Sequence, residues 1–381
     1  MNEIRLLHVA DVHLGSEVAT IAEKQDARKK ELLRTFRRVT QLCAEEEIDI
    51  LFISGDLFEG ANVDPQIVRS VKTYLEEIPS KVFISPGNHD YMAMDSPYAD
   101  EDWPKNVKIF RGEMERVVLP ELKTAIYGAG FESTYVRKTL FNHQLPVEED
   151  YLNLCIVHGD LVSENQPSDY HGITPSALSG SRMDYVALGH IHLRSPILKE
   201  GKTYYAYPGC PEGRGFDELG EKGVYLGSIS KEKMDLKFRP LSQRMYLIED
   251  MDLSEVQNEI EAEKKILVEL EKRYGKTYDQ HFYRVKVKGT LEKDQIIPWK
   301  NVEMALGEEL YSVRLVDETR IAVDYKEMAK ERSLKGYFVK KLLEELEEAE
   351  KKRDEKSLEK IHKALDYGMK AFEGQVGLRD Y

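Results

Sequence analysis

The chain contains little cysteine, and its cysteines are not arranged in a way that suggests chemistry. Its 381 residues include three, Cys43, Cys155 and Cys210, which are widely spaced and form no CxxC pair. An odd number of scattered cysteines argues against a disulfide framework, and the missing pairs argue against a thiolate zinc site. Free cysteine is commonly a small buried residue, and we interpret all three as small buried or loop residues.

Long apolar runs are also missing. No stretch approaches the roughly 20 apolar residues that a membrane helix needs. The start, MNEIRLLHVADVHLG, lacks the basic, apolar and small-residue order of a signal peptide. We therefore expect a cytoplasmic protein that does not span a membrane. The 41% hydrophobic content is ordinary for a globular chain, and the length suits one large domain with smaller appendages.

The chain has fewer basic residues than acidic residues. Lysine and arginine number 55 against 69 aspartates and glutamates, which gives a net charge of −14. This balance argues against binding polyanions over the whole surface, but a local patch or a metal can still supply a positive field. The segment RKKELLRTFRR, residues 28–38, holds six basic residues and one acidic residue. It is either the solvated face of a helix or a phosphate-binding patch.

Up to about residue 240, short apolar runs alternate with amphipathic helical stretches, which is typical of an α/β domain. Five runs are rich in β-branched residues and are bounded by glycine, proline or aspartate. They predict core strands buried on both faces. The runs are IRLLHVA, IDILFIS, KVFISP, LNLCIVH and DYVALGH.

A smaller α+β module is expected from about residue 245 to 325. It begins with an amphipathic helix, whose apolar face should carry Val256, Ile260, Leu267, Leu270 and Tyr274. The strand HFYRVKVKGTL alternates strictly, so it should bury one face and leave Arg284, Lys286 and Lys288 outside. This basic face serves solubility or contacts phosphate. A second strand is expected near LYSVRLVD.

The segment 326–381 consists mainly of helix formers and charged residues. Apolar residues at three-to-four spacing, beginning with Leu334 and Phe338, predict two amphipathic helices broken near KKRDEKS. The apolar stripe of this hairpin must be covered, either by the protein itself or by a partner.

Polar side chains follow each of the five predicted strands. Because ligands bind at the carboxyl ends of strands in open α/β sheets, these side chains should meet at one rim. In DYVALGHIH, residues 184–192, the two imidazoles are two residues apart, so in an extended chain they would reach toward one point. The predicted metal ligands are Asp11, His13, Asp56, Asn88, His158, His190 and His192.

The number and type of these ligands predict the metals and the chemistry. Seven donors are too many for one tetrahedral ion but suit two ions if one carboxylate spans both. Mixed imidazole, carboxylate and amide donors favour Mn²⁺, Fe²⁺ or Zn²⁺ over Mg²⁺ or Ca²⁺. Two dications with two aspartates leave a positive site, which would attract a phosphate and activate a water for attack on phosphorus. Gly55, Gly87 and Gly189 precede ligands, which suggests that the backbone passes close to the metals.

The GNHD segment also supplies a candidate proton donor. His89 adjoins the ligand Asn88, so its side chain should point elsewhere and could protonate the departing alkoxide. Asp90 would orient the His89 ring and raise its pKa. Alternatively, His89 only steadies the GNHD loop.

The motifs DxH, GD, GNHD, HG and GHxH, in this order, resemble those of the calcineurin-like metallophosphoesterase superfamily. The resemblance implies an α/β fold of α+β four-layer sandwich type, with two mixed sheets flanked by helices. It implies a first metal on the positions matching Asp11, His13, Asp56 and His192. The second metal would take Asp56, Asn88, His158 and His190, so that Asp56 bridges both ions.

Within this superfamily, the segments LLHVADVHLG, SGDLFEG, SPGNHD, ALGHIH and YPGCPEGRGFDELGEKGVYL are similar to SbcD and YhaO-type DNA repair exonucleases. The similarity implies a manganese-dependent nuclease with 3′ to 5′ exonuclease action on duplex ends and endonuclease action on single strands or hairpins. It divides the chain into a nuclease domain at 1–240, a capping domain at 245–325 and a helical tail at 326–381.

The same resemblance suggests partners. The tail would engage an SbcC-like coiled-coil ATPase of the SMC type, and the helix DPQIVRSVKTYLEEI would form a homodimer. Two positions depart from the pattern, because Glu59 stands where some relatives have histidine and Cys210 replaces a serine. The alternatives are a phosphoesterase for cyclic nucleotides, nucleotide-sugar pyrophosphates or phosphoproteins, and a non-catalytic scaffold.

Overall fold

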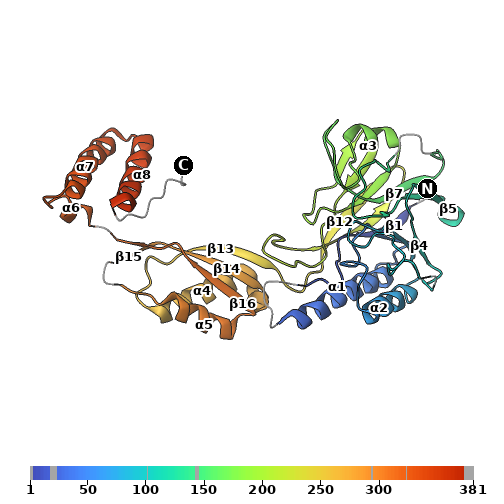
Figure 1. Cartoon of the computed structure of the whole chain (residues 1–381), viewed down its shortest axis with the longest axis horizontal. Helices are drawn as coiled ribbons and strands as arrows, with labels where there is room; N and C mark the ends of the chain where they lie inside the picture. The colour runs from blue at the N-terminus through green and yellow to red at the C-terminus, as the bar shows by residue number, and fades with distance from the viewer. Residues whose placement is uncertain are drawn as a thin grey trace. The chain divides into compact units, whose positions relative to one another are not determined.

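The computed structural model gives the fold of the chain as two compact units (Figure 1). The described residues are 3–17, 24–100, 102–141, 146–292, 295–322 and 324–372. The larger unit comprises Met1–Glu249, Glu271–Val285 and Gly307–Arg314. The smaller unit comprises Asp250–Leu270, Lys286–Leu306 and Leu315–Tyr381. The predicted capping segment therefore contributes residues to both units.

Two six-stranded mixed sheets form the larger unit, and all five predicted strands are present. The first sheet has the order β12-β11-β1-β2-β3-β4, in which β1 to β4 are parallel, β11 is antiparallel to β1, and β12 is antiparallel to β11. Its strands are β1 Ile4–Val9, β2 Ile50–Ile53, β3 Lys81–Ile84, β4 Val107–Ile109, β11 Gly223–Ile229 and β12 Met234–Pro240.

The second sheet has the order β5-β6-β7-β8-β10-β9, with antiparallel edge strands around a parallel centre. Its strands are β5 Glu115–Leu119, β6 Thr124–Gly128, β7 Leu152–His158, β8 Tyr185–Gly189, β9 Leu198–Glu200 and β10 Thr203–Ala206. A 3₁₀ turn, η2 Pro120–Leu122, joins β5 to β6.

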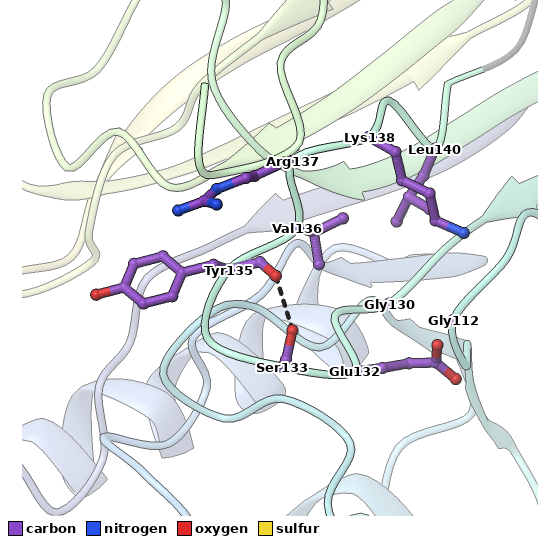
Figure 2. A pocket seen from close by; sticks show the side chains of 9 residues that line it. All are labelled: Gly112, Gly130, Glu132, Ser133, Tyr135, Val136, Arg137, Lys138 and Leu140. Atoms are coloured by element: carbon purple, nitrogen blue, oxygen red, sulfur yellow. Dashed lines mark hydrogen bonds between the residues drawn. The ribbon is translucent and has the colours of Figure 1, made fainter. Parts of the chain in front are cut away.

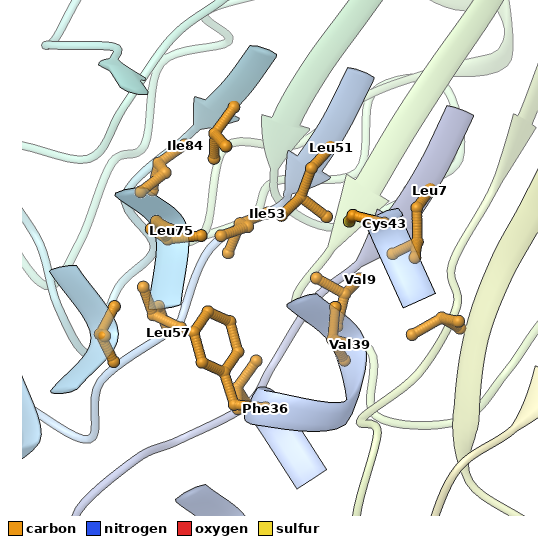
Figure 3. Close-up of a cluster of buried hydrophobic side chains, with 14 of the residues drawn as sticks. Leu7, Val9, Phe36, Val39, Cys43, Leu51, Ile53, Leu57, Leu75 and Ile84 are labelled. Carbon is orange, nitrogen blue, oxygen red and sulfur yellow. The ribbon is translucent and has the colours of Figure 1, made fainter. Parts of the chain in front are cut away.

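Three apolar layers hold the sheets and helices together. Helices α1 Gln25–Glu45 and α2 Pro65–Glu76 pack on one face of the first sheet, as the cluster in Figure 3 shows. Along β1, Leu7 and Val9 face these helices while Leu6 faces the second sheet, which is the period-two pattern of a doubly buried strand. Helix α3 Pro175–Ser181 covers the outer face of the second sheet. The predicted four-layer α/β sandwich is confirmed.

Two expectations about side chains near these layers have clear outcomes. Cys43, Cys155 and Cys210 are all free and buried, as predicted. The basic segment 28–38 lies on α1, but it is not a uniformly solvated face. Arg28 is buried, pairs with Glu31 and donates from Nη2 to the Gly213 carbonyl at 2.7 Å.

The predicted α+β module contains a three-stranded sheet of order β13-β14-β16. In β14, Tyr283, Val285 and Val287 are buried, which confirms the predicted alternation. The predicted helix face is wrong in part, because α4 buries Ala262, Ile266 and Leu270 while Ile260 is 72% exposed. Residues two apart on a helix point about 200° apart, so burial of Ala262 turns Ile260 outward. The elements are β13 Tyr246–Asp252, α4 Glu259–Tyr274, η3 Gly275–Gln280, β14 Phe282–Lys288, β15 Thr290–Leu291, α5 Trp299–Glu309, β16 Ser312–Asp317 and β17 Arg320–Ile321.

The C-terminal segment forms the predicted helical hairpin. After the short α6 Tyr325–Met328, the helices are α7 Leu334–Lys352 and α8 Glu355–Phe372. The break falls at Arg353, whose φ of 53° ends α7 in the left-handed conformation. Apolar residues of α7 and α8, among them Val339 and Leu365, pack against each other, so the hairpin covers most of its own stripe. Leu334, predicted on that stripe, is exposed.

In the described part of the chain, no helix is both long enough and apolar enough to span a bilayer.

Candidate metal centre

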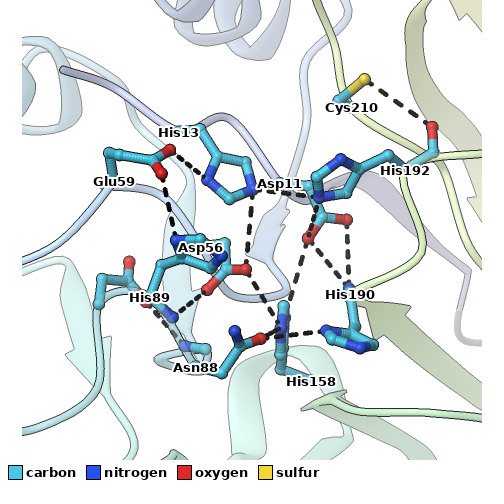
Figure 4. Close-up of polar contacts among 12 residues, drawn as sticks. Asp11, His13, Asp56, Glu59, Asn88, His89, His158, His190, His192 and Cys210 are labelled. Atoms are coloured by element: carbon cyan, nitrogen blue, oxygen red, sulfur yellow. Dashed lines mark hydrogen bonds and ion pairs between the residues drawn. The ribbon is translucent and has the colours of Figure 1, made fainter. Parts of the chain in front are cut away.

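The seven predicted donors lie together at the ends of strands from both sheets (Figure 4). The sequence suggested the rim of one open sheet, whereas β1, β2 and β3 belong to the first sheet and β7 and β8 to the second. The loops after these strands carry Asp11, His13, Asp56, Asn88, His190 and His192, and His158 ends β7.

One group contains Asp11, His13 and His192, whose ligand atoms lie within 4.8 Å of one another. The Nε2 atoms of His13 and His192 face each other at 3.1 Å. His13 donates from Nδ1 to Glu59 Oε2 at 2.8 Å, and His192 donates from Nδ1 to Glu218 Oε1 at 2.6 Å. Because an ionised carboxylate only accepts, each ring carries its proton on Nδ1 and presents a lone pair on Nε2. Two converging lone pairs fit a cation between them.

A second group contains Asp56, His158 and His190, and Asn88 completes it. Asn88 Oδ1 lies 2.9 Å from His158 Nε2 and 3.0 Å from His190 Nδ1. The Ser54 carbonyl accepts from His158 Nδ1 at 3.0 Å, and Asp160 Oδ1 lies 3.0 Å from His190 Nε2. Each ring therefore has one nitrogen in contact with a supporting oxygen and the other nitrogen directed toward Asn88 Oδ1.

Asp56 lies between the two groups. Its Oδ2 is 3.7 Å from His13 Nε2 and 3.4 Å from His158 Nε2, so one carboxylate faces both sets of donors. Burial opposes ionisation, but the charge of His158 outweighs it and holds the pKa of Asp56 well below its usual range. This is the position that a bridging carboxylate requires.

The expectation that His190 and His192 reach toward one point is wrong. Strand β8 ends at Gly189, and His190 has a φ of 105°, so the chain is no longer extended there. His192 consequently joins the group of His13, and His190 joins that of His158.

Four of the seven donors have a backbone conformation that is uncommon outside glycine. The φ angles of Asp11, His13, Asp56 and His190 are 53°, 51°, 49° and 105°. Hydrogen bonds between loops hold these turns: Asp11 N donates to the Gly55 carbonyl at 3.0 Å and His13 N to the Asp56 carbonyl at 2.9 Å. Such strain, about 1 kcal/mol or more at each residue, persists where the surrounding structure enforces it, commonly at functional sites.

The glycines before the ligands make room for ligand side chains and their supports. A Cβ at Gly55 would lie 2.1 Å from His158 Nδ1, and one at Gly87 would lie 2.2 Å from Asp56 Oδ1. A Cβ at Gly189 would lie 1.6 Å from the Ser54 carbonyl oxygen. The sequence predicted that the backbone at these glycines passes close to the metals. In the structure it passes close to the donor side chains of His158 and Asp56 and to the Ser54 carbonyl, which accepts from His158.

His89 stands beside the two groups with its side chain 40% exposed. Its backbone N–H donates to Asp56 Oδ1 at 2.9 Å, and its ring Nδ1 lies 3.3 Å from Glu59 Oε1. The hydrogen bond to Glu59 raises the pKa of His89 above its ordinary value. The ring is therefore biased toward the protonated form that a proton donor needs.

Asp90 does not have the predicted orienting role. Its buried carboxylate accepts from Gly87 N at 2.7 Å, Phe58 N at 3.1 Å and the Tyr98 hydroxyl at 2.5 Å. Asp90 therefore fixes the backbone of the GNHD loop. Burial, with the charge of Asp56, raises the pKa of Asp90 to about 6. The carboxylate on the His89 ring is that of Glu59.

Sequence reasoning missed the residues that support the donors. Arg214 donates from Nη1 to Glu59 Oε2 at 3.1 Å and from Nη2 to Glu218 Oε1 at 2.9 Å, which ties both carboxylates into one network. These contacts and those of His13 and His89 lower the pKa of Glu59 to about 2 against the effect of its burial. Glu59, Arg214 and Glu218 lie within quoted motifs, but no spacing rule links them to particular histidines.

A cavity of about 520 Å³ adjoins this network, with Glu59, Arg214 and Glu218 in its wall. Phe216 and Arg284 also line it, and the Arg284 guanidinium lies 4.2 Å from the centre of the Phe216 ring. Within the described residues, Arg284 has no hydrogen-bond or ion-pair partner. Its donors are available to an anion in the cavity.

The donor set fits divalent metal ions. Imidazole nitrogens combined with carboxylate and amide oxygens suit first-row ions such as Mn²⁺, Fe²⁺ and Zn²⁺. The carboxylates behind the imidazoles are the usual supports of metal-binding histidines. The geometry therefore accommodates metals, without selecting one of the three.

Comparison with known proteins identifies similar chains. The family model described as calcineurin-like phosphoesterase matches residues 4–194. The uncharacterized metallophosphoesterase YhaO of Bacillus subtilis is 26% identical over 274 residues, which cover 68% of this chain and 65% of the relative. The DNA double-strand break repair protein Mre11 of Methanopyrus kandleri is 26% identical over 242 residues, or 58% of this chain and 52% of the relative.

A second relative of this name has comparable similarity. The Mre11 protein of Saccharolobus solfataricus is 23% identical over 244 residues, which cover 60% of this chain and 61% of that protein. The matches thus span between half and two thirds of these relatives' own lengths. Among solved structures, the E. coli phosphoesterase YfcE matches with a TM-score of 0.28 at 18% identity, covering 54% of this chain and 80% of the other.

Proposed function

The chain belongs to the calcineurin-like phosphoesterase family, and from this premise we propose that it is a two-metal phosphodiesterase that hydrolyses DNA. The family makes it a hydrolase of phosphoesters that uses divalent metal ions. The observation that carries the proposal is the pair of donor groups with Asp56 between them.

We assign the donors to two ions. The first would be held by Asp11, His13, Asp56 and His192, and the second by Asp56, Asn88, His158 and His190. When bound, two dications offset phosphate charge and acidify the water that attacks phosphorus. Glu59, Glu218 and Asp160 keep the imidazoles in the binding orientation through the hydrogen bonds described above. Manganese is the metal that the motif resemblance favours.

His89 would supply the proton to the departing oxygen. Its ring is partly exposed beside Asp56, so a substrate can reach it. Glu59 holds Nδ1, which leaves Nε2 as the atom that releases the proton. Removing such a group costs about 100-fold or more in rate in comparable enzymes.

Two observations support DNA as the substrate. Two of the relatives are named as double-strand break repair proteins, although the YhaO relative is uncharacterized. The cavity beside the metal centre continues to Arg284, whose unpaired guanidinium suits a phosphate next to the one being cleaved. A cyclic nucleotide or a singly phosphorylated protein side chain has no such second phosphate. The activity would comprise 3′ to 5′ exonuclease action on duplex ends and endonuclease action on single strands.

The remaining parts of the proposal concern organisation. Residues 1–240 would act as the nuclease domain, 245–325 as the capping domain and 326–381 as the tail that binds an SbcC-like ATPase. Helix α2 would mediate a homodimer, and the protein would be cytoplasmic. The domain roles, the ATPase and the homodimer rest on the motif resemblance.

The test compares substrates on one preparation. The manganese-loaded chain is incubated with end-labelled duplex, a hairpin and a single strand, alongside bis-p-nitrophenyl phosphate and cyclic AMP. We expect cleavage of DNA with two metal ions per chain, and loss of all turnover in Asp56→Asn. Turnover of the small esters with intact DNA would contradict the nuclease and favour a small-molecule phosphoesterase. A metal content well below two would contradict the two-ion centre.

A further inference from the structure

A second, smaller cavity of about 210 Å³ lies in the larger unit, on the loop after β6 (Figure 2). Tyr135 stands at its wall with Arg137 and Lys138, and the tyrosine is 56% exposed. Nothing in the proposed hydrolysis uses this ring.

The backbone that carries Tyr135 is fixed. Ser133 Oγ donates to the Tyr135 carbonyl at 2.7 Å, which is the dashed contact in Figure 2. Val136 N donates to the Asp169 carbonyl at 2.8 Å, and Val136 in turn accepts from His171 N at 2.7 Å. The ring is therefore presented to solvent from a rigid support, so little ordering is needed when something binds it.

The same segment connects Tyr135 to the metal centre. The Tyr135 ring centre lies 5.8 Å from that of Tyr170, and Tyr170 lies 4.7 Å from the ring of His190. His171 Nδ1 lies 2.9 Å from the carbonyl oxygen of His158. Tyr135 is thus two ring contacts from a proposed ligand, so a strand held at the metal centre can also reach this ring.

We propose that Tyr135 is a stacking platform for an unpaired nucleobase of the strand that the metal centre cleaves, an inference that rests on the proposed nuclease function. Aromatic rings bind bases of any sequence through their faces, and single-strand sites combine such rings with cations that follow the backbone. Arg137 and Lys138 supply the cations. Their present partners, Asp169 at 2.8 Å from Arg137 and Glu113 beside Lys138, form exposed ion pairs that a phosphate can replace.

The surroundings favour a base over a protein partner. A protein-docking surface would present a contiguous apolar patch. Here the exposed ring has charged neighbours, namely Glu132, Arg137 and Lys138. Because Asp169 and Glu113 already pair with Arg137 and Lys138, stacking on the ring supplies most of the affinity for the base.

The experiment pairs removal of the ring with removal of the base. Tyr135→Ala, Tyr135→Phe and the control Tyr337→Ala, an exposed tyrosine of α7, are compared as manganese-loaded full-length chains. Each is assayed on a labelled single-stranded oligonucleotide, on versions with one abasic site moved along the strand, and on bis-p-nitrophenyl phosphate. Thermal unfolding checks that the variants fold.

We expect Tyr135→Ala to raise KM for the oligonucleotide roughly 5- to 150-fold while kcat for the small ester is unchanged. Tyr135→Phe and Tyr337→Ala should behave as the parent. An abasic site at one position should weaken the parent similarly and cause no further loss in Tyr135→Ala. Equal KM for all chains on DNA that is cleaved would overturn the platform but leave the nuclease intact. Ester turnover without DNA cleavage by the parent would overturn both.

Discussion

At the scale of single residues, carboxylates determine which ring nitrogen of His13, His192 and His190 is available to a metal ion. Glu59 and Glu218 take the Nδ1 protons of His13 and His192, so both rings present Nε2 at a separation of 3.1 Å. For His190, Asp160 contacts Nε2 and the free atom is Nδ1. The supporting residue thus decides which atom of the imidazole can bind a metal.

The proposed proton-donor role of His89 can be tested by a single substitution. His89→Ala should lower kcat by about 100-fold or more, because the departing oxygen loses its proton donor. Metal content should stay at two ions, since the ring is not among the proposed ligands. The measurements are kcat on DNA and manganese per chain.

The matched control for this change is His362→Ala, at an exposed histidine of α8. It should leave both kcat and metal content unchanged. If His89→Ala instead lost manganese, the side chain would belong to the metal shell and the proton-donor role would be wrong.

At the scale of elements, the strand ends give the centre its shape. The donors in the loops after β1, β2 and β8 include four residues with positive φ, namely Asp11, His13, Asp56 and His190. The loops are bonded to one another, as in the contact from Asp11 N to the Gly55 carbonyl at 3.0 Å. Glycine is needed where the next loop brings a side chain close.

Gly55 provides a prediction at this scale. Gly55→Ala would place a Cβ 2.1 Å from His158 Nδ1 on a residue with φ of 89°, so His158 must move. We expect manganese per chain to fall below two and the free energy of unfolding to drop by about 1 to 2 kcal/mol from the backbone conformation alone. Gly60→Ala, in the same loop but with nothing within 4 Å, should change neither quantity. Full metal content in Gly55→Ala would contradict the packing argument.

Helix α1 carries a buried charge cluster with its own pH dependence. Glu31 accepts from Arg244 Nε at 3.0 Å and pairs with Arg28, while Arg28 also lies 3.3 Å from Glu212. Burial would raise the pKa of Glu31, but these arginines outweigh burial and lower it. The ionised pair therefore stabilises the fold above the unfolded pKa of about 4.5, and this stabilisation is lost as the pH falls through the lower folded value.

Glu31→Gln should accordingly lower the free energy of unfolding at pH 7 by about 1.5 to 3 kcal/mol. The difference from the parent should shrink as the pH falls below about 4.5. Denaturant unfolding at several pH values measures both. Glu348→Gln, at an exposed pair with Lys352, should be neutral throughout. A difference that did not change with pH would exclude the ionised pair as its source.

At the scale of the whole molecule, a net charge of −14 repels a polyanion, so the proposed DNA binding requires local positive features. The proposed metal ions and Arg284, which is unpaired within the described residues, are such features. Glu59 and Glu218, which support two of the proposed metal-binding histidines, line the same cavity as Arg284. Much of the remaining positive charge is paired, as Arg28 and Arg214 show.

Arg284→Ala tests this arrangement. We expect weaker DNA binding and a salt dependence whose slope of log K against log salt is smaller by about 1, because one phosphate contact is lost. Hydrolysis of bis-p-nitrophenyl phosphate should be unchanged. Lys237→Ala, at an exposed lysine of β12, is the control and should leave the slope as it is. An unaltered slope in Arg284→Ala would exclude the phosphate contact.

The sequence by itself determined what is local. Apolar runs with β-branched residues gave the five strands, and strict alternation gave the buried face of β14, because both depend on periodicity along the chain. The donor residue types and their positions after strands could be identified in the same way. The apolar face of α4 was misassigned, because Ile260 and Ala262 both suit a helix and only packing decides which one is buried.

Only the tertiary structure decided how the donors divide and what supports them. His13 meets His192 across 179 positions and Glu59 across 46, and neither separation follows from a local pattern. The residue that contacts the His89 ring also could not be predicted from a local pattern. It is Glu59, 30 positions away, whereas the adjacent Asp90 accepts from Tyr98. Residue type and hydrophobic periodicity can be read from the sequence. The contacts that select a histidine tautomer or shift a pKa form only where loops distant in the sequence meet in the folded protein.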